Sequence, residues 1–177
     1  MLRGRGLIFA VTIAAIFAAC RGGAVAADKQ VERGRYLVML GGCVDCHTPG
    51  YFLGKPDMAH QLSGSDVGFA MPGLGVFVGA NLTPDKKTGI GTWTRQQIVT
   101  ALTTGVRPDK RVLAPIMPWR AFAGLSKADA FAIAAYLKSL PPVSHKVPGP
   151  FGPGEKASTF VMTVLPAEVY SGLPPPK

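Results

Sequence analysis

Two cysteines and a histidine lie together in the segment Cys43-Val44-Asp45-Cys46-His47. Each thiol can add to one vinyl group of a haem, and the histidine that follows at once can bind the iron from one side. The motif occurs once in the 177 residues. The spacing therefore predicts one covalent haem c, held by Cys43 and Cys46 with His47 as an axial iron ligand, and redox chemistry at that iron.

Two other kinds of site use paired cysteines. A zinc site needs a second pair of ligands, but the remaining candidates, Cys20, His60 and His145, are scattered along the chain. A thioredoxin-like dithiol expects a preceding strand within a βαβ unit, whereas residues 31–40 have a helical pattern. Both alternatives are weaker than haem attachment.

The ligand on the opposite side of the iron decides the chemistry, because a methionine thioether closes a position that would otherwise bind small molecules. Met117 lies seventy residues beyond His47, between Pro115 and Pro118. Prolines on both sides stiffen the backbone and present the side chain at low entropic cost. Met117 is thus the expected sixth ligand. Three other residues stay open as alternatives: Met71, Met58 and His60.

Residues 1–27 have the three parts of a secretory signal peptide. Arg3 and Arg5 give a positive start, residues 7–19 are continuously apolar, and Ala24-Val25-Ala26 offers a small-residue cleavage pattern. The apolar run is shorter than the ~20 residues that cross a bilayer. We expect export to the periplasm.

Cys20 leaves one alternative open at the N-terminus. The sequence Phe17-Ala18-Ala19-Cys20 loosely resembles a lipoprotein cleavage box, and only a lipid on Cys20 would attach the protein to a membrane. If Cys20 is removed with the leader, Cys43 and Cys46 are the only cysteines of the mature chain. Haem attachment then uses both, so no structural disulfide is expected.

The chain is basic, with a formal net charge of +9. Removal of the leader takes away Arg3, Arg5 and Arg21 and leaves +6. Nucleic acid is a poor partner for an exported protein whose basic residues are scattered. An acidic redox partner protein fits better, because complementary surface charge speeds transient encounters. A merely solvated surface explains the charge equally well.

Helical patterns dominate residues 28–143, which we interpret as one domain. The first helix is predicted over residues 29–40. A second begins after Thr94, with Gln97 completing a capping box, and stops at Gly105. A third begins after Ser126 and ends before Pro141-Pro142. No clear strand periodicity appears, so the fold class is mostly α with long loops.

Residues 144–177 are rich in proline and glycine. Proline removes backbone donors, so this segment is predicted to be an extended arm without regular structure. It contains an apolar patch that should pack against the domain or a partner. The patch comprises Phe160, Val161, Met162, Val164 and Leu165.

An ordered series of short segments between residues 34 and 143 resembles the class I c-type cytochromes, in particular single haem domains of cytochrome subunits of bacterial periplasmic dehydrogenases. The segments are residues 41–47, 81–85, 88–94, 105–109, 117–119 and 135–142. The resemblance implies three or more helices and long loops around one haem, with the first and last helices crossing near Gly34 and Tyr136. It also implies that the Trp93 indole N–H donates to a haem propionate. Further pocket residues are expected by the same resemblance: Asn81, Tyr36, Pro115, Trp119, Arg107 and Arg120. For the two arginines, a solvated surface position explains the residue equally well.

The function implied is transfer of single electrons between a dehydrogenase and a downstream acceptor, with no catalytic residue. Dehydrogenase cytochrome subunits often carry several haem domains, whereas this chain has one motif. That difference favours a small carrier or one subunit of a larger assembly. The alternatives are a haem enzyme or gas sensor with an open or displaceable distal site, where His60 would act, and a docking module with a structural haem.

Overall fold

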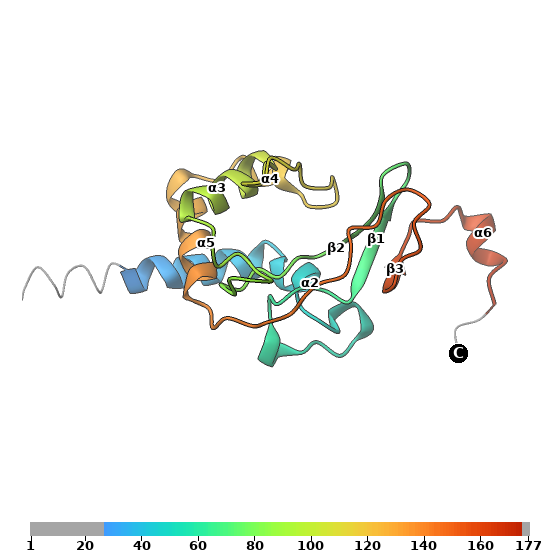
Figure 1. Cartoon of the computed structure of the whole chain (residues 1–177), viewed down its shortest axis with the longest axis horizontal. Helices are drawn as coiled ribbons and strands as arrows, with labels where there is room; N and C mark the ends of the chain where they lie inside the picture. The colour runs from blue at the N-terminus through green and yellow to red at the C-terminus, as the bar shows by residue number, and fades with distance from the viewer. Residues whose placement is uncertain (1–26, 175–177) are drawn as a thin grey trace, which may run out of the picture.

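The computed structural model describes residues 27–174 (Figure 1). The predicted leader and Cys20 lie outside the described residues. Residues 27–40 are helical, and short elements follow at Cys43–His47 (α2), Tyr51–Leu53 (η1) and Met58–His60 (η2). The remaining elements, in chain order, are β1 (Val67–Met71), β2 (Gly75–Val78), α3 (Arg95–Thr104), α4 (Trp119–Phe122), α5 (Lys127–Ser139), β3 (Phe160–Met162) and α6 (Ala167–Ser171).

The three predicted helices are confirmed: the first is helical from residue 27, the first described residue, to residue 40, and the other two have the predicted ends. The Thr94 hydroxyl accepts from the Gln97 N–H, and the Gln97 side chain accepts from the Thr94 N–H, which completes a capping box before α3. Gly105 ends α3 in the left-handed conformation, with φ of 74°. The Ser126 hydroxyl caps α5 by accepting from the Asp129 N–H.

The helix over residues 27–40 crosses α5 at Gly34, as the resemblance implied. A Cβ added at Gly34 would lie 2.6 Å from the carbonyl carbon of Ala132 and 2.8 Å from the Cβ of Tyr136. Only glycine lets the two backbones come this close. The crossing brings Val38 and Ala134, both fully buried, into one core with the apolar side of α3.

A small sheet at the other end of the molecule adds strands that no clear sequence pattern indicated. β1 pairs antiparallel with β2, and β3 pairs parallel with β1 on its other side. The β1–β2 hairpin escapes a period-two search because several of its apolar residues are half-buried on both faces. β3 lies about ninety residues further along the chain, so no local pattern could reveal that pairing.

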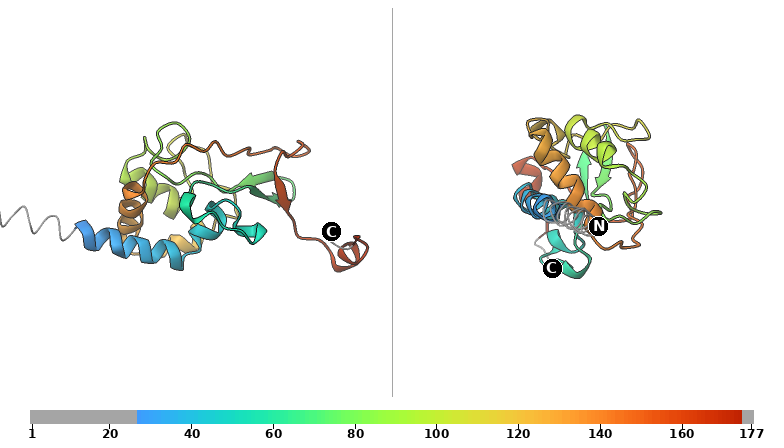
Figure 2. Two further views of the ribbon diagram at one scale, coloured as in Figure 1. Left: turned by 90° about the horizontal axis from the view of Figure 1, so that it is seen from below. Right: turned by 90° about the vertical axis from the view of Figure 1, so that its left-hand side faces the viewer.

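The C-terminal segment also differs from its prediction. It contains β3 and α6, where an arm without regular structure was expected. Between α5 and β3 the chain does run extended along the molecule, from the helices to the sheet (Figure 2). The fold is thus a small, mostly helical domain with a small sheet. No helix within residues 27–174 is long and apolar enough to span a bilayer.

Candidate haem-binding site

Both cysteines and the histidine of the predicted motif lie on one short helix, α2. Gly42 precedes it in the left-handed conformation, with φ of 66°, so the chain turns sharply out of the helix over residues 27–40. One helical turn separates Cys43 from Cys46, and His47 follows at the end of α2. The structure therefore brings these three side chains together.

His47 is held in one orientation by a backbone carbonyl. Its Nδ1 donates to the Ala80 oxygen at 2.6 Å, because a carbonyl can only accept. The side chain is 8% exposed, and burial lowers the pKa of His47, although the bond to Ala80 opposes this shift. The ring is thus neutral at pH 7 with its proton on Nδ1. Nε2 makes no hydrogen bond to any described residue and keeps a lone pair for a metal.

Gly79 allows this hydrogen bond to form. A Cβ added there would lie 2.9 Å from the Cys46 carbonyl carbon and 3.4 Å from His47 Nδ1. Any side chain would push the strand end away from α2. Gly79 and Ala80 are functional residues that the sequence analysis did not find, since a backbone carbonyl carries no signature in side-chain types.

Both thiols are free and partly exposed. Burial is the largest cause that raises the pKa of Cys43 to about 11, and the neighbouring Cys46 adds to it. Burial and then Asp45 raise the pKa of Cys46. Dithiol redox sites need a thiolate at neutral pH, and these surroundings oppose one. Among residues 27–174, no three His, Cys, Asp or Glu side chains gather as a metal-ion site.

Met117 lies in the loop between α3 and α4. Its N–H donates to the Ala114 carbonyl at 3.0 Å, which closes a turn around Pro115. The Met117 side chain is partly buried and packs against the same hydrophobic core as Cys43. The structure therefore brings the predicted sixth ligand to the core that α2 borders.

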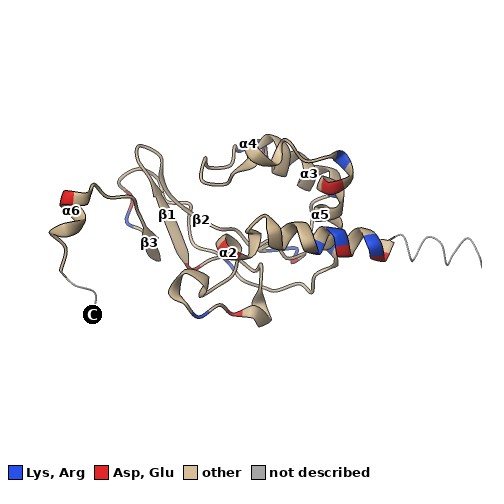
Figure 3. Cartoon of the chain, turned by 180° about the vertical axis from the view of Figure 1, so that it is seen from behind, with Lys and Arg blue, Asp and Glu red and all other residues tan. Residues whose placement is uncertain are grey.

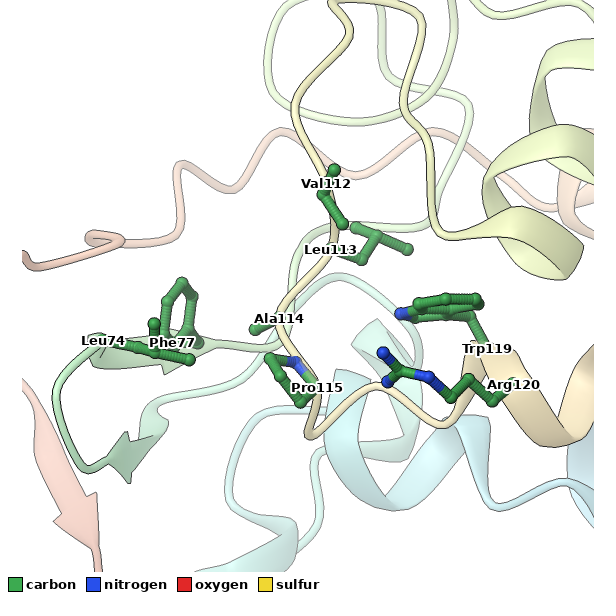
Figure 4. A pocket seen from close by; sticks show the side chains of 8 residues that line it. All are labelled: Leu74, Phe77, Val112, Leu113, Ala114, Pro115, Trp119 and Arg120. Carbon is green, nitrogen blue, oxygen red and sulfur yellow. The ribbon is translucent and has the colours of Figure 1, made fainter.

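An apolar pocket of about 250 Å³ lies between the hairpin and the Met117 loop (Figure 4). Phe77 on β2 lines one side, a short way along the chain from Ala80. Pro115 and Trp119, on either side of Met117, line the other. The pocket thus lies between the β1–β2 hairpin and the loop that carries Met117, and neither His47 nor Met117 is among its lining residues. Its remaining lining residues are Leu74, Val112, Leu113, Ala114 and Arg120.

The indole N–H of Trp119 is buried and has no acceptor among the described residues. Its ring packs on Gly105, where an added Cβ would lie 2.7 Å from the indole, and the Arg120 guanidinium lies 4.3 Å from the ring centroid on the pocket side (Figure 4). A buried donor without a partner is costly unless a bound group supplies an acceptor. The propionates of a haem are such acceptors.

Comparisons with known proteins agree with this geometry. The chain is 35% identical over 120 residues to a nicotinate dehydrogenase subunit of Pseudomonas putida, and the match covers 67% of the chain and 9% of the relative. It is 36% identical over 109 residues to the gluconate 2-dehydrogenase cytochrome c subunit of Pantoea cypripedii, covering 62% and 23%. It is 31% identical over 113 residues to a diheme cytochrome c-type protein of Cereibacter sphaeroides, covering 64% and 37%.

The chain contains a c-type cytochrome domain. The resemblance drawn from the residues is thereby confirmed, and haem c is the cofactor that it implies. The chain spans less than two fifths of the length of each of these three relatives. No protein-family model matches the chain.

The residues of the cytochrome domain fit this cofactor. Two protonated thiols can form thioethers, His47 offers a free Nε2, and the buried Trp119 N–H needs an acceptor. Trp93, the donor implied by the resemblance, is half-buried against the core, with the Arg107 guanidinium 5.3 Å from its ring centroid. Its role toward a propionate stays a prediction.

Two other predicted pocket residues have different surroundings in the cytochrome domain. Asn81 is 2% exposed, and its amide donates to Thr88 Oγ1 and the Val143 carbonyl while its oxygen accepts from Thr83. It therefore ties loops together with its polar atoms already engaged. Tyr36 is 55% exposed, and the guanidinium of Arg33 lies 5.5 Å from its ring centroid, so its surroundings are those of a surface residue.

The alternative sixth ligands have surroundings that differ from those of Met117. His60 is exposed, and its Nδ1 bonds to the Asp57 carboxylate at 2.7 Å. Met58 is about half exposed on the same short helix. Met71 ends β1, where its backbone is paired with Gly75. None of the three shares the packing of Met117 against the core.

Proposed function

We propose that the chain is a periplasmic monohaem cytochrome that carries single electrons. Haem c is attached through Cys43 and Cys46, with His47 and Met117 as axial ligands of the iron. The observation that carries this proposal is the hydrogen bond from His47 Nδ1 to the Ala80 carbonyl at 2.6 Å, which leaves Nε2 free. That arrangement prepares an imidazole for iron and serves no other site in the described chain.

When bound, haem supplies a one-electron change at its iron. The residues of the chain set the conditions for it. The Ala80 carbonyl fixes the His47 tautomer and makes the ring a stronger electron donor. The thioether of Met117 would fill the last iron position and favour the reduced state. Apolar side chains beside the Met117 loop, such as Phe77 and Leu113, would reduce the solvent that must reorganise when the charge on the iron changes.

The electron donor in this proposal is a dehydrogenase. The relatives include cytochrome c subunits of quinone-type alcohol dehydrogenase, of gluconate 2-dehydrogenase and of fructose dehydrogenase. Each name joins a cytochrome to an oxidising enzyme. We infer the same arrangement here, with electrons passed on to a downstream acceptor protein. The leader over residues 1–27 would place the protein in the periplasm, and mass spectrometry of the mature N-terminus tests that placement.

Expression of the full chain in a host that attaches haem c tests the cofactor. The mature protein should carry one haem by pyridine haemochrome assay and one haem mass increment that survives denaturation. Cys43→Ser with Cys46→Ser should abolish the covalent increment, whereas Ser158→Ala, on the segment before β3 and outside α2, should keep it. A colourless mature protein would overturn the proposal.

Carbon monoxide separates a carrier from a haem enzyme or gas sensor. An iron with both axial positions filled by side chains should bind carbon monoxide slowly and incompletely in the reduced protein. Fast and complete binding under native conditions would contradict the electron-carrier proposal and indicate a haem enzyme or gas sensor with an open axial position. The wild-type spectrum in urea, where Met117 is free to leave, is the positive control.

A further inference from the structure

The C-terminal segment ends in a strongly apolar surface that no part of the described chain covers. We define the apolar arm as residues 157–173. It projects from the sheet, away from the helices, and carries α6 at its outer part (Figures 1 and 2). Val164 is 96% exposed and Tyr170 is 70% exposed. The other exposed large apolar residues of the arm are Phe160, Val161, Met162, Leu165, Val169 and Leu173.

The base of the arm is fixed to the domain at several points. Phe151 is buried and exchanges two backbone hydrogen bonds of 2.9 Å with Val76 on β2. β3 pairs with β1, and the Thr159 hydroxyl donates to the Asp66 carbonyl. The base of the arm, as far as β3, is therefore held against the sheet before any partner binds. Such preorganisation lowers the entropic cost of binding.

Charge distinguishes the arm from the rest of the molecule. Residues 28–156 carry fifteen Lys and Arg against nine Asp and Glu, a net charge of +6. The arm has one charged residue, Glu168 (Figure 3). A surface with this composition is typical of the buried centre of an interface, where charged residues are depleted and aromatic residues and methionine are enriched.

The same charges decide among possible occupants of this surface. A second copy would bring two bodies of charge +6 together, and their repulsion opposes self-association. A membrane surface attracts apolar helices whose polar face is rich in Lys and Arg, but the arm has neither residue. A different protein with an uncharged apolar groove remains as the occupant.

We propose that the apolar arm docks in an apolar groove on the catalytic subunit of the dehydrogenase that reduces this cytochrome. The inference rests on the proposed function, because that function supplies the partner. It adds the surface by which the two subunits are held together. The haem domain would then stay close to its electron donor through contacts that are separate from the pocket side of the molecule.

The test uses the tagged full chain, matured with haem and purified under native conditions from its source organism. The catalytic subunit is identified by peptide mass spectrometry and by the absorption or mass of its own cofactor. Val164→Asp and Tyr170→Asp place a charge on the arm at exposed positions and should leave the fold intact. Leu53→Asp is the matched control, an exposed apolar residue on η1, outside the arm.

We expect the wild type and Leu53→Asp to recover equal amounts of the catalytic subunit. Both arm variants should recover at least about tenfold less of it, because truncating a side chain at the centre of an interface typically weakens binding by that much or more. Haem content and the thermal midpoint of all four proteins should agree. Two further measurements on the purified cytochrome, sedimentation velocity and flotation with anionic and zwitterionic phospholipid vesicles, should show a monomer that does not bind lipid.

Several results would overturn the inference. Full recovery of the catalytic subunit by the arm variants would mean that docking uses another surface. Dimers that depend on the arm would identify a second copy as its occupant, and vesicle binding that depends on the arm would identify a membrane. A haem-loaded wild type with a measurable reduction potential that recovers no dehydrogenase subunit would also overturn it. That last result leaves haem electron transfer standing, so failure of the arm and failure of the cofactor proposal are distinguishable.

Discussion

At the scale of single residues, the site depends on one close backbone approach. Gly79→Ala would push the Ala80 carbonyl away from His47 Nδ1, because the added Cβ meets the Cys46 carbonyl. Overpacking of this kind costs about 1–3 kcal/mol. We expect a lower yield of matured haem protein and a lower midpoint in urea, measured by haemochrome assay and by circular dichroism. Gly152→Ala, with only the Glu155 side chain near its Cβ at 3.7 Å, should behave as wild type.

The axial ligand opposite His47 is a second prediction at this scale. Met117→Ala should remove the near-red ferric absorption band of methionine-to-iron ligation and lower the reduction potential, because the thioether favours ferrous iron. Protein voltammetry and the ferric spectrum measure both effects. Met71→Ala and Met58→Ala are the controls and should keep the band. Persistence of the band in Met117→Ala, with its loss in either control, would identify a different ligand.

At the scale of elements, the crossing of the helix over residues 27–40 with α5 holds the domain together. Gly34→Ala places a Cβ against the Ala132 backbone, and backbone cannot yield as a flexible side chain can. We expect the free energy of unfolding to fall by about 1–3 kcal/mol. Urea unfolding of the haem-loaded protein measures it. Gly124→Ala meets only the Ala121 oxygen at 3.4 Å and should change stability by less than about 0.5 kcal/mol.

Local sequence patterns determined which elements could be predicted. The helices carry their own start and stop residues, such as the Thr94 and Gln97 capping box, so their bounds follow from nearby side chains. The β1–β3 pairing joins Val67 to Phe160, far apart in the sequence, and no short pattern encodes it. The proline and glycine content of the C-terminal segment predicted no strand there, because β3 depends on hydrogen bonds to β1, a distant part of the chain.

In the candidate site, too, sequence patterns reveal some residues and miss others. Cys43, Cys46 and His47 are found from side-chain types at fixed spacing, since covalent attachment and iron ligation both require those types. The partner of His47 is a backbone oxygen, which Ala80 provides no better than most residues would. The orphaned Trp119 N–H could be recognised only once burial was known. Sequence therefore identifies the groups that touch iron more readily than the groups that orient them.

At the scale of the whole molecule, the positive charge should govern encounters with charged redox reagents. The loop before Met117 forms a hairpin closed by the Val106–Val112 pairing, and it carries Arg107, Lys110 and Arg111. Only Arg107 is paired within this hairpin, with Asp109 at 3.1 Å. The hairpin belongs to the loop that lines the pocket, so its positive field lies close to the proposed haem.

Reduction of the ferric protein by anionic hexacyanoferrate(II) should therefore slow several-fold as salt rises from ~10 mM to ~0.3 M, because screening weakens attraction to a basic surface. Reduction by cationic hexaammineruthenium(II) should speed up over the same range. Stopped-flow spectroscopy measures both rates. Lys110→Glu and Lys29→Glu change the net charge equally, but Lys29 lies on the helix over residues 27–40, outside the hairpin. A larger effect in Lys110→Glu would locate electron entry near the hairpin, and equal effects would mean that net charge alone sets the rate.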